Sequence, residues 1–401
     1  MPDKKVVIVG GGISGLSFVS QAIQADYQTT LIESTDRIGG CFDSHRFGDF
    51  SLELGAHTCY NSYRGLISII EKYALADALL KRNKVSFMVY NKGKVEKIVK
   101  HLSFLEILVS LPKIFNIKKG NLSVKDYYQA ILGSNNYKNI LGPSFNAVLS
   151  QDAGPFPADS LFKKRERRKD IFRSYTLRGG LQTIADKISQ DKKLTIHTTC
   201  TLTKIMKTDS GFQLTLSSGE LLQTDFLVLA TPVSSATAYL KDLYPNIASE
   251  LSKIETAQVE SVGVVVDKMK VKHPPFAGLI PTNDDFFSVV SRDVITHEKF
   301  RGFTFHFRPG LLDEKQKLAK ITQVLGITQD DLIDTEERTR SLPKLSMQHK
   351  NILAKIDQAL IGTNIYLTGN YFQGLAVEDC INRSFLEFNR LIQEFVHQKS
   401  S

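Results

Sequence analysis

The sequence contains no tryptophan and only four cysteines among its 401 residues. The cysteines, Cys41, Cys59, Cys200 and Cys380, form no C-x-x-C pair, so their spacing favours a reducing compartment over a disulfide framework or a metal site. No run of about 20 apolar residues is present, and we therefore expect no membrane-spanning helix. A strand begins within five residues of the start, which leaves no room for a signal peptide, so we expect a cytoplasmic protein.

The sequence also lacks a visible Ser-His-Asp triad, paired carboxylates, a metal-ligand set and any nucleic-acid-binding motif. We therefore expect no bound metal and no nucleic-acid partner. An enzyme without such groups is expected to rely on a cofactor for its chemistry. Hydrophobic residues make up 42% of the chain and charged residues 23%. This is an ordinary globular balance, and the length predicts two or three domains.

The net charge of +9 is concentrated in two segments. Residues 81–119 carry ten Lys or Arg against two Glu, and residues 161–178 carry eight against two acidic residues, while the remainder is slightly acidic. Within the first segment, "LSFLEILVSLPKIFNIKK" (102–119) is apolar and flanked by lysines. This pattern predicts peripheral attachment to an anionic membrane surface, with an ordinary buried helix as the alternative. The run "KKRERRK" (163–169) is typical of a solvated face.

The N-terminus reads as strand, glycine turn, helix and second strand. In "KKVVIVGGGISGLSFVSQAIQADYQTTLIE", Gly10, Gly12 and Gly15 have the spacing of a dinucleotide-binding turn. The first glycine allows the tight turn, the second lets the backbone approach a pyrophosphate, and the third lets the helix pack on the strand. Glu33 ends the second strand, where its carboxylate is placed to accept hydrogen bonds from ribose hydroxyls. The motif predicts a dinucleotide cofactor.

Three further stretches carry a family resemblance. "RIGG" (37–40), "ELGAH" (53–57) and the near-terminal "GNYFQGLAVEDC" (369–380) together make the chain similar to the superfamily of FAD-dependent amine oxidases, phytoene desaturases and protoporphyrinogen oxidases. The last stretch resembles the closing segment of protoporphyrinogen oxidases most. Likenesses also occur in "YTLRGGLQTIADKI" (175–188), "DFLVLATP" (225–232) and "FAGLIPTNDD" (276–285), so the resemblance covers nearly the whole chain.

The resemblance implies an α/β fold with a discontinuous, Rossmann-like FAD-binding domain of the amine oxidase type. We expect residues 1–85, 191–245 and 355–401 to form that domain. Residues 86–100 and 246–354 are expected to form an inserted antiparallel-sheet substrate domain. Residues 101–190 are expected to form a helical insert, which is the membrane-binding region in this interpretation.

The cofactor implied by the resemblance is non-covalent FAD, with Cys380 as a small buried residue at the start of a helix. The residues expected to bind FAD lie in the glycine turn, the acidic strand end, the loop after it, the strand that returns to the domain and the closing segment. They are Gly10, Gly12, Ile13, Ser14, Gly15, Glu33, Ser34, Arg37, Gly39, Gly40, Gly55, Ala56, His57, Leu202, Ala230, Thr231, Gly369, Asn370, Leu375, Ala376 and Val377.

The implied reaction is hydride transfer from a small-molecule substrate, a reduced tetrapyrrole, to flavin N5, with molecular oxygen as the electron acceptor. Phe286, Phe287, Tyr371 and Phe372 are candidates for an apolar substrate slot, with core packing as the alternative. His57 is a candidate acid or base facing the substrate, with a structural histidine as the alternative.

Two positions depart from the family pattern. Ala56-His57 stands where a proline and a polar residue are common, and Ser86 stands where an arginine is common, so neighbouring lysines such as Lys84 are the candidates to bind an anionic substrate. An amine oxidase is one rival interpretation, although the missing tryptophan weakens the case for an aromatic cage. An oxidase of another heterocyclic metabolite and an FAD-binding protein without turnover are the others.

Overall fold

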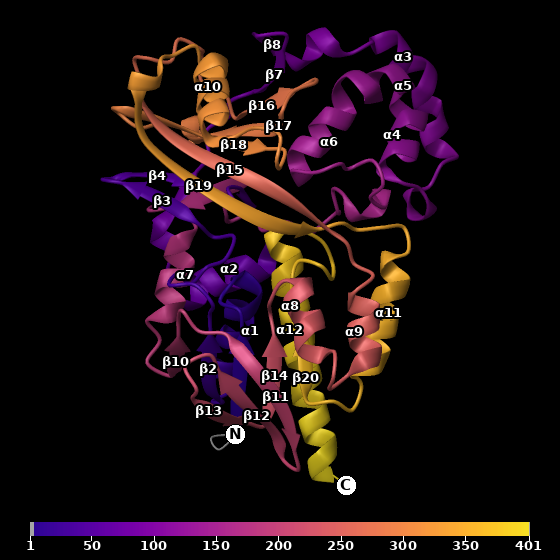
Figure 1. The fold of residues 1–401 in the computed structure, drawn as a ribbon. Helices are drawn as coiled ribbons and strands as arrows, with labels where there is room; N and C mark the ends of the chain where they lie inside the picture. The colour runs from indigo at the N-terminus through magenta and orange to yellow at the C-terminus, as the bar shows by residue number, and fades with distance from the viewer. Residues whose placement is uncertain (1–3, 401) are drawn as a thin grey trace.

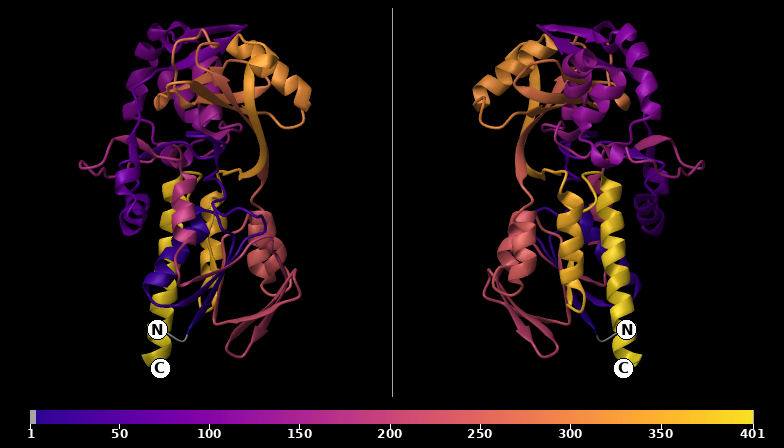
Figure 2. Two further views of the ribbon diagram at one scale, coloured as in Figure 1. Left: turned by 90° about the vertical axis from the view of Figure 1, so that its left-hand side faces the viewer. Right: turned by 90° about the vertical axis from the view of Figure 1, so that its right-hand side faces the viewer.

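The computed structural model describes the backbone of residues 4–400 and the side chains of residues 4–394. The chain forms a lower body around a parallel sheet and an upper body around a larger, mostly antiparallel sheet (Figure 1). The helix α12 runs along the lower body in all three views (Figure 2). The chain crosses between the bodies several times, so each body is assembled from distant segments.

The sheet of the lower body has five strands, and every neighbouring pair is parallel. In spatial order they are β10 (Leu194–His197), β2 (Gln28–Ile32), β1 (Lys5–Val9), β14 (Phe226–Leu229) and β20 (Ile365–Leu367). The last four residues of β1 and all of β14 are buried. Continuous apolar runs of this kind are typical of parallel strands that are covered on both faces.

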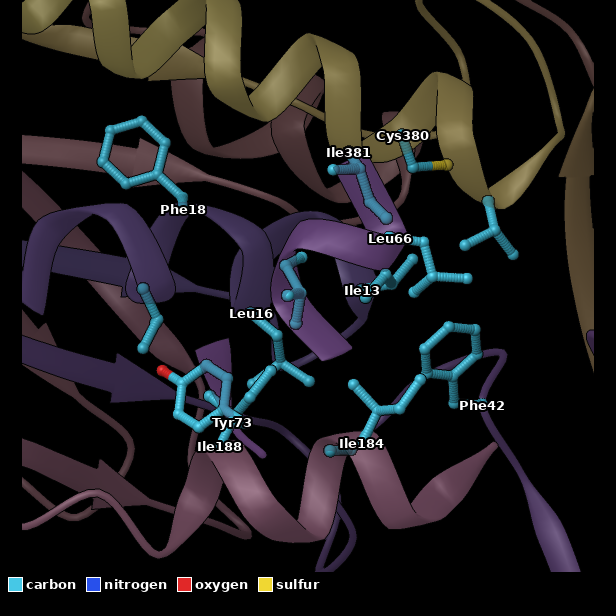
Figure 3. Close-up of a cluster of buried hydrophobic side chains, with 14 of the residues drawn as sticks. Ile13, Leu16, Phe18, Phe42, Leu66, Tyr73, Ile184, Ile188, Cys380 and Ile381 are labelled. Carbon is cyan, nitrogen blue, oxygen red and sulfur yellow. The ribbon is translucent and has the colours of Figure 1, made fainter. Parts of the chain in front are cut away.

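Two layers cover this sheet. One contains α1 (Ile13–Gln24), α2 (Arg64–Lys72), α7 (Gln182–Ser189) and α12 (Val377–Ser400). The other contains α8 (Val233–Leu240), α9 (Pro245–Leu251), α11 (His349–Leu360) and the antiparallel sheet of β11 (Leu202–Thr208), β12 (Gly211–Leu216) and β13 (Leu221–Thr224). Val6 and Ile8 face the first layer, and Val7 and Val9 face the second. Figure 3 shows the first core, where side chains from α1, α2, α7 and α12 converge.

The upper body is built on a seven-stranded sheet. In spatial order its strands are β19 (Leu332–Pro343), β15 (Thr256–Asp267), β18 (Phe300–Phe307), β17 (Phe286–Ser291), β16 (Gly278–Pro281), β7 (Phe87–Asn91) and β8 (Lys94–Lys97). The β16–β7 pair is parallel and the others are antiparallel. The helix α10 (Glu314–Leu325) covers one face of this sheet. The hairpin of β3 (Ser44–Phe47) and β4 (Phe50–Glu53) packs on the other face, where Gly263 and Gly302 leave room for its side chains.

A helical segment lies beside the upper sheet (Figure 1). It contains α3 (Phe104–Ser110), η3 (Leu111–Phe115), α4 (Val124–Leu132), α5 (Ser134–Asn136), the π-helical η5 (Tyr137–Leu141) and α6 (Gly142–Leu149). The following β9 (Ser174–Leu177) pairs with β5 (Cys59–Tyr60) and β6 (Leu79–Lys81), and α7 packs into the core of the lower body. This arrangement favours a helical insert that ends before Ser174.

The predicted fold class is confirmed: an α/β chain with a discontinuous Rossmann-like sheet and an inserted, mainly antiparallel sheet. The parallel pairing of β7 with β16 is the one departure in the upper sheet. It arises because β7 enters this sheet from the N-terminal part of the chain, directly after β6.

Candidate functional site

The glycine turn joins β1 to α1 at the carboxyl end of the parallel sheet. Gly10 has φ +104°, and a Cβ there would lie 2.5 Å from the carbonyl oxygen of Ala230. A Cβ at Gly15 would lie 1.9 Å from the carbonyl oxygen of Gly10. A Cβ at Gly12 would meet no protein atom closer than 3.9 Å. Gly10 and Gly15 are thus required by the packing of the chain itself, whereas Gly12 leaves backbone open to a ligand at the first turn of α1.

Glu33 lies directly beneath this turn. Its Oε2 accepts a hydrogen bond from the Gly11 backbone N–H at 2.8 Å. Its Oε1 accepts from the backbone N–H and the hydroxyl of Thr35, both at 2.9 Å, and from the Ser34 hydroxyl at 3.1 Å. The strand end, the glycine turn and the next loop are therefore fixed to one carboxylate, at the place expected for a ribose-binding residue.

The loop after Glu33 presses against the glycine turn. The Gly39 N–H donates to the Gly11 carbonyl at 2.8 Å. Gly40 has φ +57°, and a Cβ at Gly40 would lie 2.8 Å from the Gly12 Cα. The Arg37 guanidinium donates to the Phe42 carbonyl and to the Gly40 carbonyl at 2.7 and 2.8 Å. Arg37 therefore holds the shape of this loop, in addition to the phosphate contact that the family resemblance implies for it.

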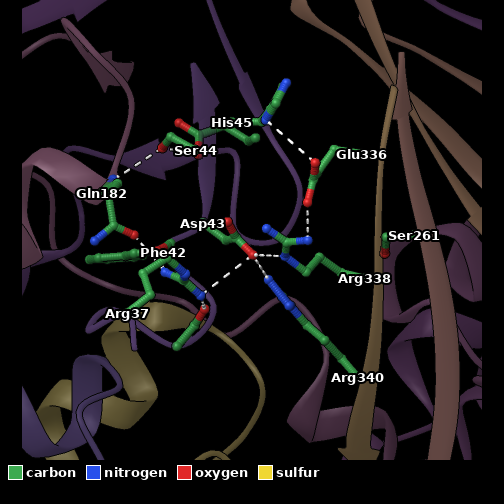
Figure 4. A network of polar contacts seen from close by, with 12 residues as sticks. Arg37, Phe42, Asp43, Ser44, His45, Gln182, Ser261, Glu336, Arg338 and Arg340 are labelled. Atoms are coloured by element: carbon green, nitrogen blue, oxygen red, sulfur yellow. Dashed lines mark hydrogen bonds and ion pairs between the residues drawn. The ribbon is translucent and has the colours of Figure 1, made fainter. Parts of the chain in front are cut away.

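The carboxylate of Asp43, which is almost fully buried, contacts three guanidinium groups (Figure 4). Its Oδ2 lies 3.4 Å from Arg37 Nη2 and 3.1 Å from Arg338 Nε, and it also contacts Arg340 Nη2. Even with Glu336, which pairs with Arg338, the cluster keeps an excess positive charge. The Arg340 Nε is buried without a hydrogen-bond partner.

Sequence reasoning missed Arg338 and Arg340, because they lie in β19, almost 300 residues from Asp43. The available signal was the alternation of charged side chains in "LIDTEERTRSLP". Alternation of this kind places every second side chain on one face of a strand. It does not show which loop that face will meet.

The "ELGAH" turn stands next to this cluster. The Ala56 N–H donates to the Cys41 carbonyl at 2.8 Å, and a Cβ at Gly55 would lie 2.3 Å from the same oxygen. His57 Nδ1 lies 3.2 Å from the Gly55 carbonyl, so Nδ1 carries the proton and Nε2 is left as an acceptor. Burial, and then the charge of Arg82, lowers the pKa of His57 to about 4. The imidazole is therefore neutral near pH 7.

A second buried histidine reaches the same region from β18. His306 Nδ1 shares a hydrogen bond with Ser261 Oγ at 2.9 Å. Burial, followed by the effects of His57 and Arg340, lowers the pKa of His306 to about 3. Two neutral imidazoles thus meet between the bodies, with cationic side chains nearby. Sequence reasoning identified His57 but not His306, which stands in a strand rich in phenylalanine.

Arg82 is the cation whose charge helps to lower the pKa of His57. Its Nη1 donates to the hydroxyl of Thr58, and its Nε is buried without a hydrogen-bond partner. Arg82 forms no ion pair with any carboxylate of the described residues. Lys84, the lysine favoured by the sequence, is instead exposed. Arg82 therefore replaces Lys84 as the candidate for binding an anionic group.

The closing segment brings the two ends of the chain together. Ser384 of α12 donates to the Ser14 carbonyl of α1 at 2.8 Å and shares a hydrogen bond with Thr368 at 2.7 Å. Gly369 has φ +154°, and Val377 begins α12. The start of α1 is therefore fixed to the N-terminal part of α12.

The other predicted FAD-binding residues are distributed around the same end of the sheet. Ile13 and Ser14 form the first turn of α1, and Ala230, whose N–H donates to the Val9 carbonyl at 2.8 Å, follows β14. The remaining residues lie in the loop after β20, at the start of α12 and at the start of β11. They are Asn370, Leu375, Ala376 and Leu202.

The four aromatic candidates for the substrate slot are buried, and three of them lie in hydrophobic cores. Phe286 packs with Phe305 and Phe307 beneath α10, and Phe287 lies under the Arg308 guanidinium, 4.3 Å from its ring centre. Tyr371 and Phe372 lie in the second core of the lower body, and the Arg383 guanidinium covers Phe372 at 3.8 Å. These positions favour the packing interpretation over the substrate slot.

The run "KKRERRK" is not a purely solvated face, which corrects the expectation from its composition. Lys163 Nζ and Arg165 Nη2 lie 3.1 and 2.7 Å from Asp379, at the start of α12. Arg168 pairs with Glu71 of the lower body at 2.7 Å. These ion pairs attach the segment after α6 to the lower body.

Cys380 points into the first core beside Ile381 (Figure 3) and is 4% exposed. Burial raises the pKa of its thiol. Both features agree with a small buried residue. The described residues also include no group of three or more His, Cys, Asp or Glu side chains arranged to hold a metal ion.

The residues of this region fit FAD on structural grounds. Gly12 leaves backbone open where a pyrophosphate is expected, and the N-terminus of α1, which has no side-chain cap, supplies donors. Thr231, another predicted FAD-binding residue, has a buried hydroxyl without a hydrogen-bond partner. Buried polar atoms of this kind are normally satisfied by a partner.

Comparisons with known proteins agree with this geometry. Residues 8–71 match the family model of the NAD(P)-binding Rossmann-like domain, and residues 143–276 match that of the flavin containing amine oxidoreductases. The coproporphyrinogen III oxidase of Bacillus subtilis (strain 168) is 22% identical to this chain over 464 aligned residues. The alignment covers 95% of this chain and 96% of that enzyme, so the likeness extends from end to end.

Solved structures show the same fold. A protein of Exiguobacterium sp. 255-15, provisionally described as a protoporphyrinogen oxidase, superposes with a TM-score of 0.84 at 18% identity. The match covers 98% of this chain and 100% of that one. The fatty acid isomerase of P. acnes that produces CLA matches with a TM-score of 0.76 at 16% identity, over 97% of this chain and 99% of that one.

Proposed function

Because this chain belongs to the superfamily of FAD-dependent amine oxidases and protoporphyrinogen oxidases, we propose that it oxidises a porphyrinogen, a reduced tetrapyrrole with propionate side chains. The end-to-end likeness to coproporphyrinogen III oxidase carries this proposal. FAD supplies the hydride acceptor, its N5 atom, and molecular oxygen is the proposed final acceptor of the electrons. The predicted flavin-binding residues would hold FAD non-covalently, and acid precipitation should release it.

The charge of the wall around His57 supports an anionic substrate. Arg82 is half-buried and forms no ion pair with any described carboxylate. A partly desolvated cation of this kind binds a carboxylate strongly, because the charge-assisted hydrogen bond replaces solvent that burial has removed. A propionate bound to Arg82 would place the tetrapyrrole next to His57. This histidine ends the turn 53–57, which is predicted to contact the flavin.

The histidines define what the chain itself does in the reaction. Oxidation of a porphyrinogen removes a hydride from a bridging carbon and a proton from a pyrrole nitrogen. His57 Nε2 is an acceptor, so it can accept a hydrogen bond from the pyrrole N–H that loses this proton. Burial and Arg82 lower the pKa of His57 to about 4, which makes it a weak base, so its proposed part is to orient the pyrrole ring. His306, bound to Ser261, maintains a second neutral polar group on the same wall.

Anaerobic mixing with porphyrinogens tests the proposal, because bleaching of the flavin reports hydride transfer directly. We expect protoporphyrinogen or coproporphyrinogen to bleach the flavin, and air to restore its colour with formation of the fluorescent porphyrin and peroxide. Bleaching by primary amines or amino acids alone would assign the chain to the amine oxidase branch. No bleaching by any of these compounds would favour a flavin-binding protein without turnover.

The helical segment supports a further part of the proposal, peripheral attachment to an anionic membrane. Among the residues that the structure describes, no helix is both long and apolar enough to cross a bilayer. In α3 and η3, however, large apolar side chains face solvent, among them Leu105 at 73%, Leu108 at 68% and Phe115 at 88% exposure. Lysines on both sides of this stretch complement anionic lipid.

Flotation with anionic liposomes at low salt tests this attachment. We expect the wild-type protein to bind, and a variant with Leu105, Leu108 and Leu111 changed to Ser to lose binding while it retains its flavin. Met206→Ser and Leu221→Ser, at exposed positions of the β11–β13 sheet, provide a matched control. Equal binding of all three proteins would contradict the proposal.

A further inference from the structure

A row of polar side chains crosses the upper sheet on the face that meets the lower body. Ser261 of β15 and Ser288 of β17 are both paired with His306 of β18, so the three side chains share one face of the sheet. Thr304, two residues before His306 in the same strand, donates to the Glu53 carbonyl at 2.7 Å, so this face meets the "ELGAH" turn. We call Ser261, His306 and Ser288 the polar row.

A register shift of the β-bulge kind in β17 turns Ser288 toward this face. Phe286 is paired with Phe307 and packs beneath α10, but the register shifts after Phe286, and Ser288 is paired with His306. Simple alternation along the strand would place Ser288 on the same side as Phe286, in the core beneath α10. Bulges redirect side chains in this way and are common next to active sites. A specific irregularity of β17 therefore presents Ser288 to the lower body.

The polar row contains two atoms that no described residue satisfies. Ser288 is 5% exposed, and its buried Oγ has no hydrogen-bond partner in the part of the chain that the structure describes. His306 is 7% exposed and bonds to Ser261 through Nδ1, whereas its Nε2 makes no hydrogen bond to a described residue. Buried polar atoms are normally paired, so two neighbouring ones without a protein partner point to a ligand.

The charges around the polar row restrict the chemistry of that ligand. Arg82, which follows β6, acts on His57, and Arg340 of β19 acts on His306. Burial, followed by the effects of His57 and Arg340, lowers the pKa of His306 to about 3, so this imidazole is neutral near pH 7. Both guanidinium groups would repel a protonated amine, and the polar row contains no carboxylate to bind one. A neutral ring with N–H donors and with anionic groups at its periphery matches this pattern.

We propose that Ser288 and His306 bind pyrrole nitrogens of the substrate, and that Ser261 positions His306 for this contact. The inference rests on the proposed porphyrinogen reaction. The ring of a porphyrinogen carries pyrrole N–H donors and no charge, so it needs neutral partners, which a hydroxyl and a neutral imidazole provide. Oxidation leaves a pyrrole nitrogen without its proton. The Ser288 hydroxyl can accept a hydrogen bond from the ring before this change and donate one to it afterwards.

Anaerobic stopped-flow bleaching of the flavin tests the proposal, with whichever of protoporphyrinogen and coproporphyrinogen bleaches the wild type faster. The dependence of the rate on substrate concentration gives the apparent Kd separately from the limiting rate. Ser288→Ala should raise the apparent Kd about three- to tenfold, which is the effect of losing one neutral hydrogen bond. Its flavin content and its midpoint of urea unfolding without substrate should not fall, because the hydroxyl has no described protein partner. Ser288→Thr, which keeps the hydroxyl, should recover most of the affinity.

Ser291→Ala is the matched control from the same strand. Ser291 is paired with Phe303 on the face toward α10, and its Oγ accepts the Asp293 N–H at 3.0 Å. This variant should lose stability and keep the wild-type apparent Kd, which is the reverse of the result expected for Ser288→Ala. If Ser288→Ala does not fold, Ser261→Ala replaces it. That variant releases the His306 ring and should also raise the apparent Kd.

Two kinds of failure are distinguishable. The inference is overturned while the proposed function stands if the wild type is bleached and the Ser288 and Ser261 variants keep its apparent Kd. It is also overturned if Ser288→Ala loses stability without losing affinity, because the serine would then be structural. If neither porphyrinogen bleaches the wild type, the proposed function fails, and the inference fails with it.

Discussion

The predicted flavin-binding side of the candidate site and the wall of side chains around His57, which we call the opposite wall, are built in different ways. On the flavin side, continuous stretches of chain meet through backbone contacts, as where Gly39 bonds to Gly11 and Gly15 packs against Gly10. On the opposite wall, single side chains from separate elements meet: Arg82 from the segment after β6, His306 from β18 and Arg340 from β19. The contacts on the flavin side require glycine at certain positions. The contacts on the opposite wall require charged side chains from distant strands to face one another.

Gly15→Val should have the largest effect, because it attacks the backbone contact on the flavin side. The new Cβ would lie 1.9 Å from a carbonyl oxygen that cannot move away. We expect destabilisation by about 3 kcal/mol or more and loss of bound flavin, measured by urea unfolding and by absorbance. Gly120→Val is the control, since a Cβ at Gly120 meets nothing within 4 Å. Equal stability of both variants would show that the turn adapts to a side chain.

Arg82→Gln tests the opposite wall, where a side chain and not the backbone is expected to matter. Loss of a charge-assisted hydrogen bond to a propionate should cost about 1.5–3 kcal/mol, which corresponds to a ten- to hundredfold lower kcat/KM for porphyrinogen. Flavin content should not change. Lys84→Gln, two residues away and exposed, is the matched control and should retain activity. A larger loss in the lysine variant would restore Lys84 as the anion-binding residue.

Glu33→Ala sharpens the comparison, because Glu33 is a side chain that acts on the flavin side. Its removal deletes acceptors for Gly11 and Thr35 and the expected acceptors for the ribose. We expect flavin affinity to fall by about 1.5–3 kcal/mol while the fold persists, measured as flavin retained after dialysis and by circular dichroism. Glu33→Gln, which keeps one acceptor oxygen, should lose less. Full flavin retention in the alanine variant would contradict the assignment.

Taken per pH unit, the smallest effect is that of pH on stability, and it belongs to the opposite wall. The pKa of His57 is lowered to about 4 and that of His306 to about 3, so the unfolded chain binds more protons than the folded one below about pH 6.5. Stability should therefore fall as the pH drops from 6.5 toward 4, by at most about 1.4 kcal/mol per pH unit for each histidine. His57→Gln and His306→Gln should each flatten this slope in urea unfolding.

The sequence was sufficient for the parts of the molecule that depend on local backbone geometry. The spacing of Gly10, Gly12 and Gly15 indicated strand, turn and helix in the right order, because each glycine meets a steric requirement set by residues nearby in the chain. The apolar run of β1 was predicted from its local pattern, and the closing stretch before α12 from the family resemblance. The family resemblance added the discontinuous sheet, in which β20 completes a fold begun more than 300 residues earlier.

Only the tertiary structure decided which charged side chains meet. Arg338 and Arg340 reach Asp43 because β19 pairs with β15 in one particular register. A shift by one residue would turn both arginines to the opposite face. Arg82, and not the exposed Lys84, acts on His57, although simple alternation in an extended segment would place both side chains on one side, because Arg82 is held by a hydrogen bond to Thr58 of another segment. Pairing register and the packing of distant elements are properties of the whole fold, whereas a glycine's steric requirement is local and is therefore visible in the sequence.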